Sequence, residues 1–283
     1  MVKLKKSKAQ TVMVVASISG LLGILPAFIE NVGVSQEQPP LLLPAKQLQK
    51  LAQSITVKVR AERVLGTGIL INREGAIYTV LTNDHVLMAG APPYQIETPD
   101  GKIHPAIGEE TPLEDNDLGY VQFRSATDYQ VASLGAASDL KEGDSVFAAG
   151  FPFPYWRDEL PTGPSPPFSK EKLEGFVFRS GKVSGVLDKA LAGGYRVGYS
   201  NLIDKGMSGG PLLNEDGEVV AVNGMHAEPL WGNPYIYKDG SQPSQSEKER
   251  MSRYSWGIPI ETFVELGRSP LMPDDSTTLE VEP

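Results

Sequence analysis

The chain has 283 residues, with 35 acidic and 26 basic side chains and a formal net charge of −9. Its 29 glycines and 23 prolines favour many short strands joined by turns over a bundle of long helices. Apolar residues make up 40% of the chain, which is enough for a packed core, so the composition is not that of a disordered protein. The acidic balance argues against nucleic-acid binding, and the absence of cysteine excludes disulfide scaffolds, cysteine nucleophiles and thiolate metal sites.

The first forty residues have the pattern of an export signal. Four lysines within residues 3–8 precede an apolar run over residues 11–29. A helix that spans a bilayer needs about 20 apolar residues, so the run fits either a cleaved signal peptide, with Gly33-Val34-Ser35 as a candidate cleavage site, or a retained membrane anchor. We therefore expect residues 1–40 to be a signal peptide or anchor with its linker. The rest of the chain is expected in the periplasm or outside the cell, with membrane contact only through this segment if it is not cleaved.

Short runs of β-branched and aliphatic residues, separated by turn residues, follow in the first half of the chain. They predict strands at residues 55–59, 66–71, 76–82 and 118–123. Residues 48–133 are therefore expected to form an antiparallel β-barrel.

The second half repeats this type of pattern after residues 134–143, which have little apolar content and are expected to be a linker. Within residues 144–268 strands are predicted at 145–149, 176–178, 181–187, 195–199, 210–213, 218–223 and 254–258. The segment 151–175 holds six prolines, too many for a central strand, and is predicted to be a loop. A second polar loop is predicted at 233–253, a short helix at 260–266, and an acidic disordered tail at 269–283. The whole pattern predicts an all-β fold with two antiparallel barrels in tandem.

The sharpest chemical signal is the glycine-rich segment Gly206-Met207-Ser208-Gly209-Gly210-Pro211. Glycines allow a tight turn that brings backbone N–H groups close to a bound carbonyl, so the amides of Gly206 and Ser208 are candidates for an oxyanion hole. A serine hydroxyl is a weak nucleophile and needs a nearby base. The chain holds three histidines that could supply it, His85, His104 and His226.

The same segment also matches the G-x-S-x-G elbow of α/β-hydrolases, but its surroundings do not fit that class. The elbow requires a helix directly after the serine and a histidine after the acid. Here Pro211 and the following residues predict a hairpin, and His226 is the only histidine downstream of Ser208. The elbow interpretation is therefore rejected.

The order histidine, aspartate, serine fits better. His85 stands at the end of a predicted strand and Asp117 at the start of another. Three blocks at these positions, TNDHVL around His85, NDLGYVQF around Asp117 and GMSGGPLLNEDGEVVAVNG around Ser208, resemble the chymotrypsin-fold serine peptidases, most closely the HtrA/Deg branch. Further segments at 66–72, 179–186 and 256–266 also resemble that branch, so the resemblance covers residues 50–266.

The resemblance implies two six-stranded chymotrypsin-like barrels and a catalytic triad. Ser208 would be the nucleophile, His85 the base and Asp117 the residue that orients it. Glu114 and Asp115 compete for the role of the acid, but Asp117 is preferred because an aliphatic strand begins directly after it. Met207 occupies the position of an aspartate that pairs with a freed amino terminus in zymogen-type relatives, so activation by propeptide cleavage is not expected. A PDZ domain, usual in the HtrA/Deg branch, is not expected either.

The substrate pocket is predicted from the same resemblance. Leu202 and Ile203 stand where the base of the primary pocket is expected, which indicates an apolar residue before the scissile bond. Asn223 matches the position of a histidine in glutamate-specific relatives, and His226 either narrows the pocket wall or is an exposed loop residue. His104 is predicted to be a hairpin surface residue without a role.

These features predict an exported serine endopeptidase that hydrolyses polypeptides through an acyl-enzyme intermediate. The alternative is a catalytically silent trypsin-like domain that binds proteins or acts as a chaperone, because an intact triad does not by itself guarantee the geometry of catalysis. Three scattered histidines without an H-E-x-x-H motif offer no metal site, and no cofactor is expected. Nothing in the sequence indicates an oligomeric state.

Overall fold

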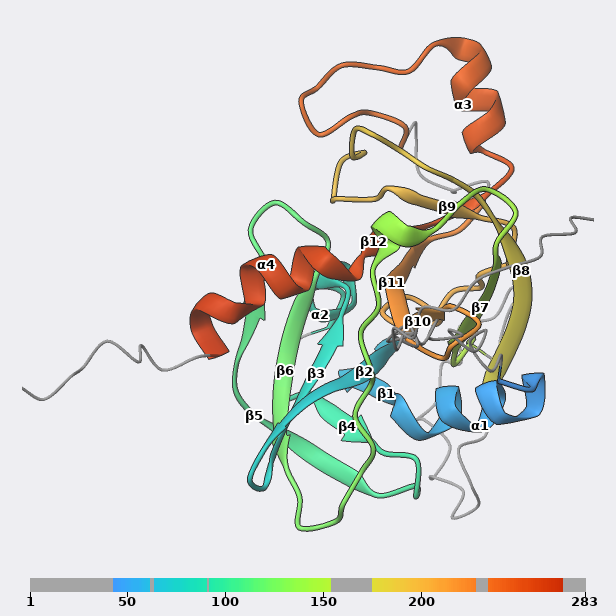
Figure 1. Cartoon of the computed structure of the whole chain (residues 1–283). Coiled ribbons are helices and arrows are strands. Elements are labelled where there is room, and N and C mark those ends of the chain that lie inside the picture. The colour runs from blue at the N-terminus through green and yellow to red at the C-terminus, as the bar shows by residue number, and fades with distance from the viewer. Residues whose placement is uncertain (1–42, 62–63, 91, 154–174, 228–233, 272–283) are drawn as a thin grey trace, which may run out of the picture. The chain divides into compact units, whose positions relative to one another are not determined.

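The computed structural model describes residues 43–61, 64–90, 92–153, 175–227 and 234–271 (Figure 1). The chain divides into two compact units, Met1–Pro39 and Pro40–Pro283, and all of the described residues belong to the second. The predicted export segment lies outside the described residues, as does most of the predicted proline-rich loop. In the described ranges no helix is long and apolar enough to cross a membrane.

The first six strands close into an antiparallel barrel in the order β1-β2-β3-β6-β5-β4. They are β1 (Thr56–Ala61), β2 (Val64–Glu74), β3 (Ile77–Thr82), β4 (Gln95–Glu97), β5 (Ile103–Pro112) and β6 (Gly119–Arg124). The sequence predicted four of them, because β4 has only three residues and β5 holds two prolines. Alternating burial along β1 turns Val57 and Val59 into the barrel, where they pack against Tyr78, Ile96 and Phe123.

A second antiparallel barrel follows, with the order β10-β11-β12-β9-β8-β7. Its strands are β7 (Ser145–Gly150), β8 (Val177–Val186), β9 (Val197–Tyr199), β10 (Pro211–Leu213), β11 (Val219–Met225) and β12 (Ser255–Pro259). The two strands predicted at 176–178 and 181–187 are one continuous strand, β8, which pairs with β7 along its first half. The expected all-β fold of two six-stranded barrels is thus confirmed.

The described residues also form the helices α1 (Ala45–Ile55), α2 (Asp84–Met88), α3 (Gln245–Met251) and α4 (Ile260–Leu271). The helix α1 includes residues 48–55, which were predicted from the sequence to belong to the first barrel. Its buried residues are Leu48, Ala52 and Ile55. The helix predicted at 260–266 extends to Leu271, so the first three residues of the predicted tail are helical rather than disordered. The remainder of that tail, residues 272–283, lies outside the described residues.

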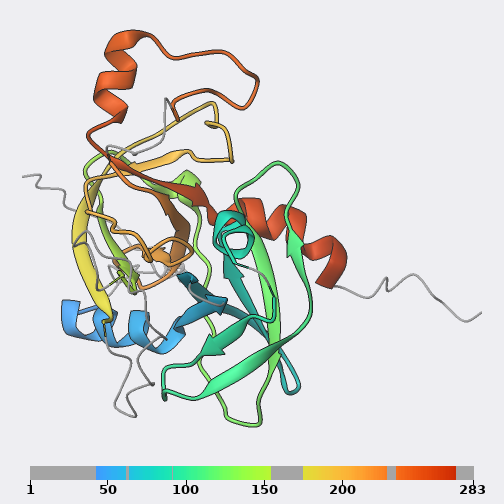
Figure 2. The same ribbon diagram turned by 180° about the vertical axis from the view of Figure 1, so that it is seen from behind.

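The two barrels are joined by ordered contacts. The predicted linker forms a β-bridge between Leu134 and Val219 of β11, followed by the 3-10 helix η1 (Ala137–Asp139). Figure 1 and Figure 2 show α4 beside the strands of the first barrel, although it follows β12 of the second. Its residues Ile260 and Phe263 share one apolar cluster with Ile71 of β2 and Tyr120 of β6. The cluster therefore holds the two barrels against each other.

Candidate active site

His85 lies on α2, the short helix that begins where β3 ends. Its ring nitrogen Nδ1 is 2.7 Å from Oδ2 of Asp117, and its backbone N–H donates to Oδ1 of the same carboxylate at 2.8 Å. The side chain of His85 is 47% exposed and that of Asp117 is 18% exposed. A carboxylate at Nδ1 favours the tautomer with the proton on that nitrogen, which leaves Nε2 free to accept a proton.

The backbone of Asp117 is fixed from both barrels. Its N–H donates to the carbonyl of Gly193 at 2.9 Å, and its own carbonyl accepts from Nδ2 of Asn83 at 2.7 Å. The hydroxyl of Tyr195, from the segment before β9, donates to Oδ2 of the carboxylate. Sequence reasoning missed Tyr195, because a contact across 78 residues leaves no local signal. The competing acids Glu114 and Asp115 are exposed, and the carboxylate that contacts His85 is the expected Asp117.

Ser208 lies on a turn of the second barrel that is hydrogen-bonded to β2 of the first. Thr67 of β2 makes two hydrogen bonds to this turn. Its hydroxyl donates to the carbonyl of Gly206 at 2.6 Å, and its N–H donates to the carbonyl of Ser208 at 2.9 Å. Gly209 also touches β3, since a Cβ there would lie 2.2 Å from the hydroxyl of Thr82. Thr82 stands three residues before His85, so the serine turn packs against the strand that leads to the histidine.

The turn requires glycine at two positions. Gly206 has φ of +94° and Gly209 has φ of +85°, conformations that residues with a side chain rarely adopt. A Cβ at Gly206 would lie 2.5 Å from the carbonyl oxygen of Phe151. Over the described ranges, no protein acceptor takes the backbone N–H of Gly206 or of Ser208. These are the two donors that the sequence assigns to the oxyanion hole.

The four residues predicted to line the substrate pocket differ in their surroundings. Leu202 is 68% exposed and His226 is partly exposed, whereas Ile203 packs in the apolar core of the second barrel. Asn223 is fully buried and accepts a hydrogen bond from the hydroxyl of Tyr199 at 2.9 Å. Its amide donates to two backbone carbonyls, at 3.1 and 3.2 Å. Of the four, only Leu202 and His226 are exposed or partly exposed.

An ion pair that was not predicted from the sequence lies beside Leu202. Arg179 of β8 pairs with Asp204 at 2.6 Å and also donates to the carbonyl of Leu202 at 2.8 Å. The guanidinium is thus neutralised by Asp204 and holds the backbone next to Leu202 in place. The exposed leucine is the apolar group at this point of the surface.

His104 lies on the hairpin formed by β4 and β5, where the sequence predicted it, but it is only partly exposed. Its Nε2 is 3.1 Å from the hydroxyl of Tyr129, and its ring packs against Phe123 in the first barrel. Burial lowers the pKa of His104 below its usual range, and the nearby Lys102 adds to that effect, while Asp100 opposes it. His104 is a structural residue of that barrel, because β5 turns its ring toward the aromatic cluster.

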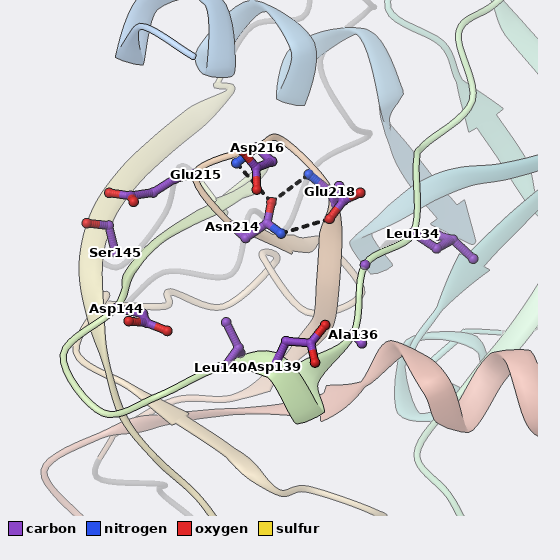
Figure 3. A pocket seen from close by; sticks show the side chains of 11 residues that line it. Leu134, Ala136, Asp139, Leu140, Asp144, Ser145, Asn214, Glu215, Asp216 and Glu218 are labelled. Atoms are coloured by element: carbon purple, nitrogen blue, oxygen red, sulfur yellow. Dashed lines mark hydrogen bonds between the residues drawn. The ribbon is translucent and has the colours of Figure 1, made fainter. Parts of the chain in front are cut away.

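A separate hollow lies between the linker and the turn that joins β10 to β11 (Figure 3). Five residues with carboxylates contribute to its lining: Asp139, Asp144, Glu215, Asp216 and Glu218. The side chain of Asn214 orders the turn by accepting from the backbone N–H groups of Asp216 and Glu218. None of the residues predicted to form the triad lines this hollow. Within the part of the chain that the structure describes, no group of histidine and acidic residues is arranged to hold a metal ion.

Comparison with known proteins supports the same family as the site geometry. A family model described as "Trypsin-like peptidase domain" matches residues 66–222. The chain is 30% identical over 158 residues to "Serine protease HTR4" of Rattus norvegicus, which covers 56% of this chain and 29% of that protein. It is 29% identical over 170 residues to "Serine protease Do-like HtrA" of Bacillus subtilis, covering 56% of this chain and 33% of that protein.

Solved structures of the same type share the fold. The structure titled "HtrA-type protease AlgW with tripeptide" superposes with a TM-score of 0.56 at 20% identity, covering 80% of this chain and 63% of that one. The matches to the two curated relatives quoted above cover 29% and 33% of those proteins, so the chain spans about a third of their length. At this level of identity the structural likeness supports the fold of the two barrels.

Proposed function

Because the chain belongs to the trypsin-like peptidase domain family, we propose that it is a serine endopeptidase of the HtrA/Deg type that hydrolyses polypeptides. The observation that carries this proposal is the carboxylate of Asp117, which binds both the ring and the backbone of His85. The glycine-rich turn with Ser208 packs against the strand that leads to that histidine. The contact between His85 and Asp117, together with a serine turn that packs against the strand before His85, supports a triad at the junction of the two barrels.

In the proposed reaction, Nε2 of His85 takes the proton of the Ser208 hydroxyl as Oγ attacks the carbonyl carbon of the scissile peptide bond. The carbonyl electrons move onto oxygen, and the N–H groups of Gly206 and Ser208 donate to this oxyanion. One such donor contributes about 3–4 kcal/mol in a well-studied protease. The tetrahedral intermediate collapses, the C–N bond breaks, and the leaving amine takes the proton from His85. An acyl ester on Ser208 remains.

Water then hydrolyses the acyl-enzyme by the same steps. His85 accepts a proton from the water as its oxygen attacks the ester carbonyl, and returns that proton to Oγ as Ser208 leaves. Asp117 keeps its negative charge throughout and stabilises the imidazolium that forms in each half of the reaction. The exposed side chain of Leu202 favours substrates with an apolar residue before the scissile bond.

One observation favours the second candidate function, a protein-binding domain without catalysis. The hydroxyl of Ser208 donates to the carbonyl of Gly224 at 3.4 Å. A hydroxyl bonded in that direction is not directed at the base, so catalysis requires it to rotate when substrate arrives. A domain in which the rotation does not occur would bind polypeptides and release them unchanged.

The proposed setting of the protein is outside the cytoplasm. This rests on the lysines and the apolar run of residues 1–40, which precede the described ranges. The membrane would be reached through residues 11–29 alone, if that segment is retained.

The proposal is tested by treating the full chain with a fluorophosphonate probe, beside Ser208→Ala as the matched control. The probe phosphonylates a serine only where a base and an oxyanion site activate it. We expect labelling of the native chain, no labelling of Ser208→Ala, and cleavage of an unfolded protein substrate by the native chain only. A folded native chain that neither labels nor cleaves would contradict the proposed peptidase and favour the binding domain.

A further inference from the structure

Tyr195 contacts the atom of Asp117 on which the orientation of His85 depends. Its hydroxyl donates to Oδ2, the same carboxylate oxygen that lies 2.7 Å from Nδ1 of His85. Tyr195 belongs to the second barrel and Asp117 to the first, so this hydrogen bond crosses between the barrels. The tyrosine side chain is almost fully buried, with 5% of the residue exposed.

Two glycines lie close to the side chain of Tyr195. A Cβ at Gly224 would lie 2.3 Å from the tyrosine oxygen, so any side chain at that position would displace the hydroxyl. On its other side the ring lies against Gly193, where a Cβ would be 3.1 Å from it. Gly193 in turn accepts the backbone N–H of Asp117. The segment that contains Gly193 and Tyr195 therefore binds Asp117 twice, once at its backbone N–H and once at its carboxylate.

A neighbouring loop fixes the segment that carries Tyr195. The N–H of Ala192 donates to the carbonyl of Ile236 at 2.7 Å, and the N–H of Lys238 donates to the carbonyl of Ala190 at 2.9 Å. The ammonium of Lys238 also donates to the side chain of Asn116, next to Asp117, at 3.2 Å. Hydrogen bonds to the neighbouring loop therefore fix the backbone that carries Tyr195.

We propose that Tyr195 is a positioning residue of the triad, which holds the carboxylate of Asp117 in the orientation that keeps the proton of His85 on Nδ1. This inference rests on the proposed function for its kinetic consequence, but its structural consequence is independent of turnover. With the tyrosine hydroxyl removed, Oδ2 keeps one donor in place of two, and the carboxylate is free to turn away from the imidazole. Burial, followed by the negative charge of Asp117, raises the pKa of Tyr195 well above its usual value, so the hydroxyl remains a donor wherever the protein is folded.

The kinetic test is Tyr195→Phe, which removes the hydroxyl and keeps the ring. A hydrogen bond to a charged group contributes enough that its loss should lower kcat about 10- to 100-fold, while KM changes by less than about twofold because no substrate contact is lost. Tyr78→Phe is the matched control. Its buried hydroxyl, in the first barrel, donates to the carbonyl of Thr127 at 2.9 Å, so its removal should lower stability and leave kcat unchanged.

A double-mutant cycle separates positioning from a general structural effect. In the background of Asp117→Asn, the further change Tyr195→Phe should alter kcat by less than about twofold, because the tyrosine acts through the carboxylate that is already gone. A full additional loss in that background, or an unchanged kcat in Tyr195→Phe alone, would overturn the proposal.

The second readout is nitrogen NMR of the imidazoles, which is tractable because the chain has three histidines. We expect the protonated Nδ1 of His85 in the native chain and in Tyr78→Phe, and a mixture of the two tautomers in Tyr195→Phe. If the native chain is inactive but shows this difference, the proposed function fails and the positioning role stands. If Tyr195→Phe gives the same His85 signals as the native chain, the positioning role fails, whatever the activity.

Discussion

The carboxylate of Asp117 is the side chain through which the parts of the site act on one another. It accepts from the ring and backbone of His85 and from the hydroxyl of Tyr195. An amide in its place would keep the size and shape but would offer His85 an N–H group or a neutral oxygen. The imidazole would then carry its proton on the wrong nitrogen.

At the residue scale we therefore predict that Asp117→Asn folds as the native chain does and loses about 10⁴-fold in kcat. The measurement is the rate of cleavage of an unfolded protein substrate, with circular dichroism as the check on folding. Asp115→Asn is the matched control, because it removes an exposed carboxylate two residues away. Loss of activity in Asp115→Asn with full activity in Asp117→Asn would move the acid to the other residue.

At the element scale, the turn between β4 and β5 is organised around a second carboxylate. Oδ1 of Asp100 accepts from the hydroxyl of Thr98 at 2.7 Å and from that of Tyr129 at 3.1 Å, and Oδ2 lies 2.8 Å from the ammonium of Lys102. Burial raises the pKa of Asp100, but the hydrogen bonds from Lys102, Thr98 and Tyr129 outweigh it and lower the pKa to about 2. The ordinary value is 3.8, so the folded state favours the charged carboxylate.

This shift has a definite sign in the stability of the chain. Because the folded pKa is the lower one, the carboxylate stabilises the fold above about pH 4, and the contribution is lost as the pH falls through about 2. We predict that Asp100→Asn lowers the midpoint of urea unfolding near neutral pH and that the difference from the native chain closes at about pH 2. A difference between the two unfolding midpoints that stays constant with pH would contradict a stabilising role for the charged Asp100 carboxylate.

The elements also show what the sequence could and could not predict. Strands with alternating apolar residues, such as β1, were predictable because the pattern is local. The strand β4 could not be predicted, because its three residues are extended only through pairing with β1 and β5 in the closed barrel. The helix α3 carried a readable signal, because Ser244 and Glu247 form a capping box. Tyr195 is the corresponding case in the site: its partner is set by the packing of two barrels and by no neighbour in sequence.

At the scale of the whole molecule, the proposed machinery is divided between the barrels. His85 and Asp117 come from the first and Ser208 from the second, so activity depends on how closely the two approach. Thr67 makes the connection, with its N–H bonded to the carbonyl of Ser208 and its own carbonyl accepting from the hydroxyl of Thr82. There is no room for a side chain at Gly209 in this junction, since a Cβ there would lie 2.0 Å from the carbonyl oxygen of Thr67.

We therefore predict that Gly209→Ala lowers fluorophosphonate labelling of Ser208 by at least about 100-fold, because a displacement of about 1 Å at a reacting group has an effect of that size. The matched control is Gly75→Ala in the turn between β2 and β3. Gly75 also has a positive φ, of +59°, but a Cβ there meets nothing within 4 Å. Both variants carry the backbone strain of about 1–2 kcal/mol, and only Gly209→Ala forces the barrels apart. Equal labelling of the two variants would mean that the spacing of the barrels does not control the serine, whereas loss in Gly209→Ala alone would tie activity to the junction at Thr67.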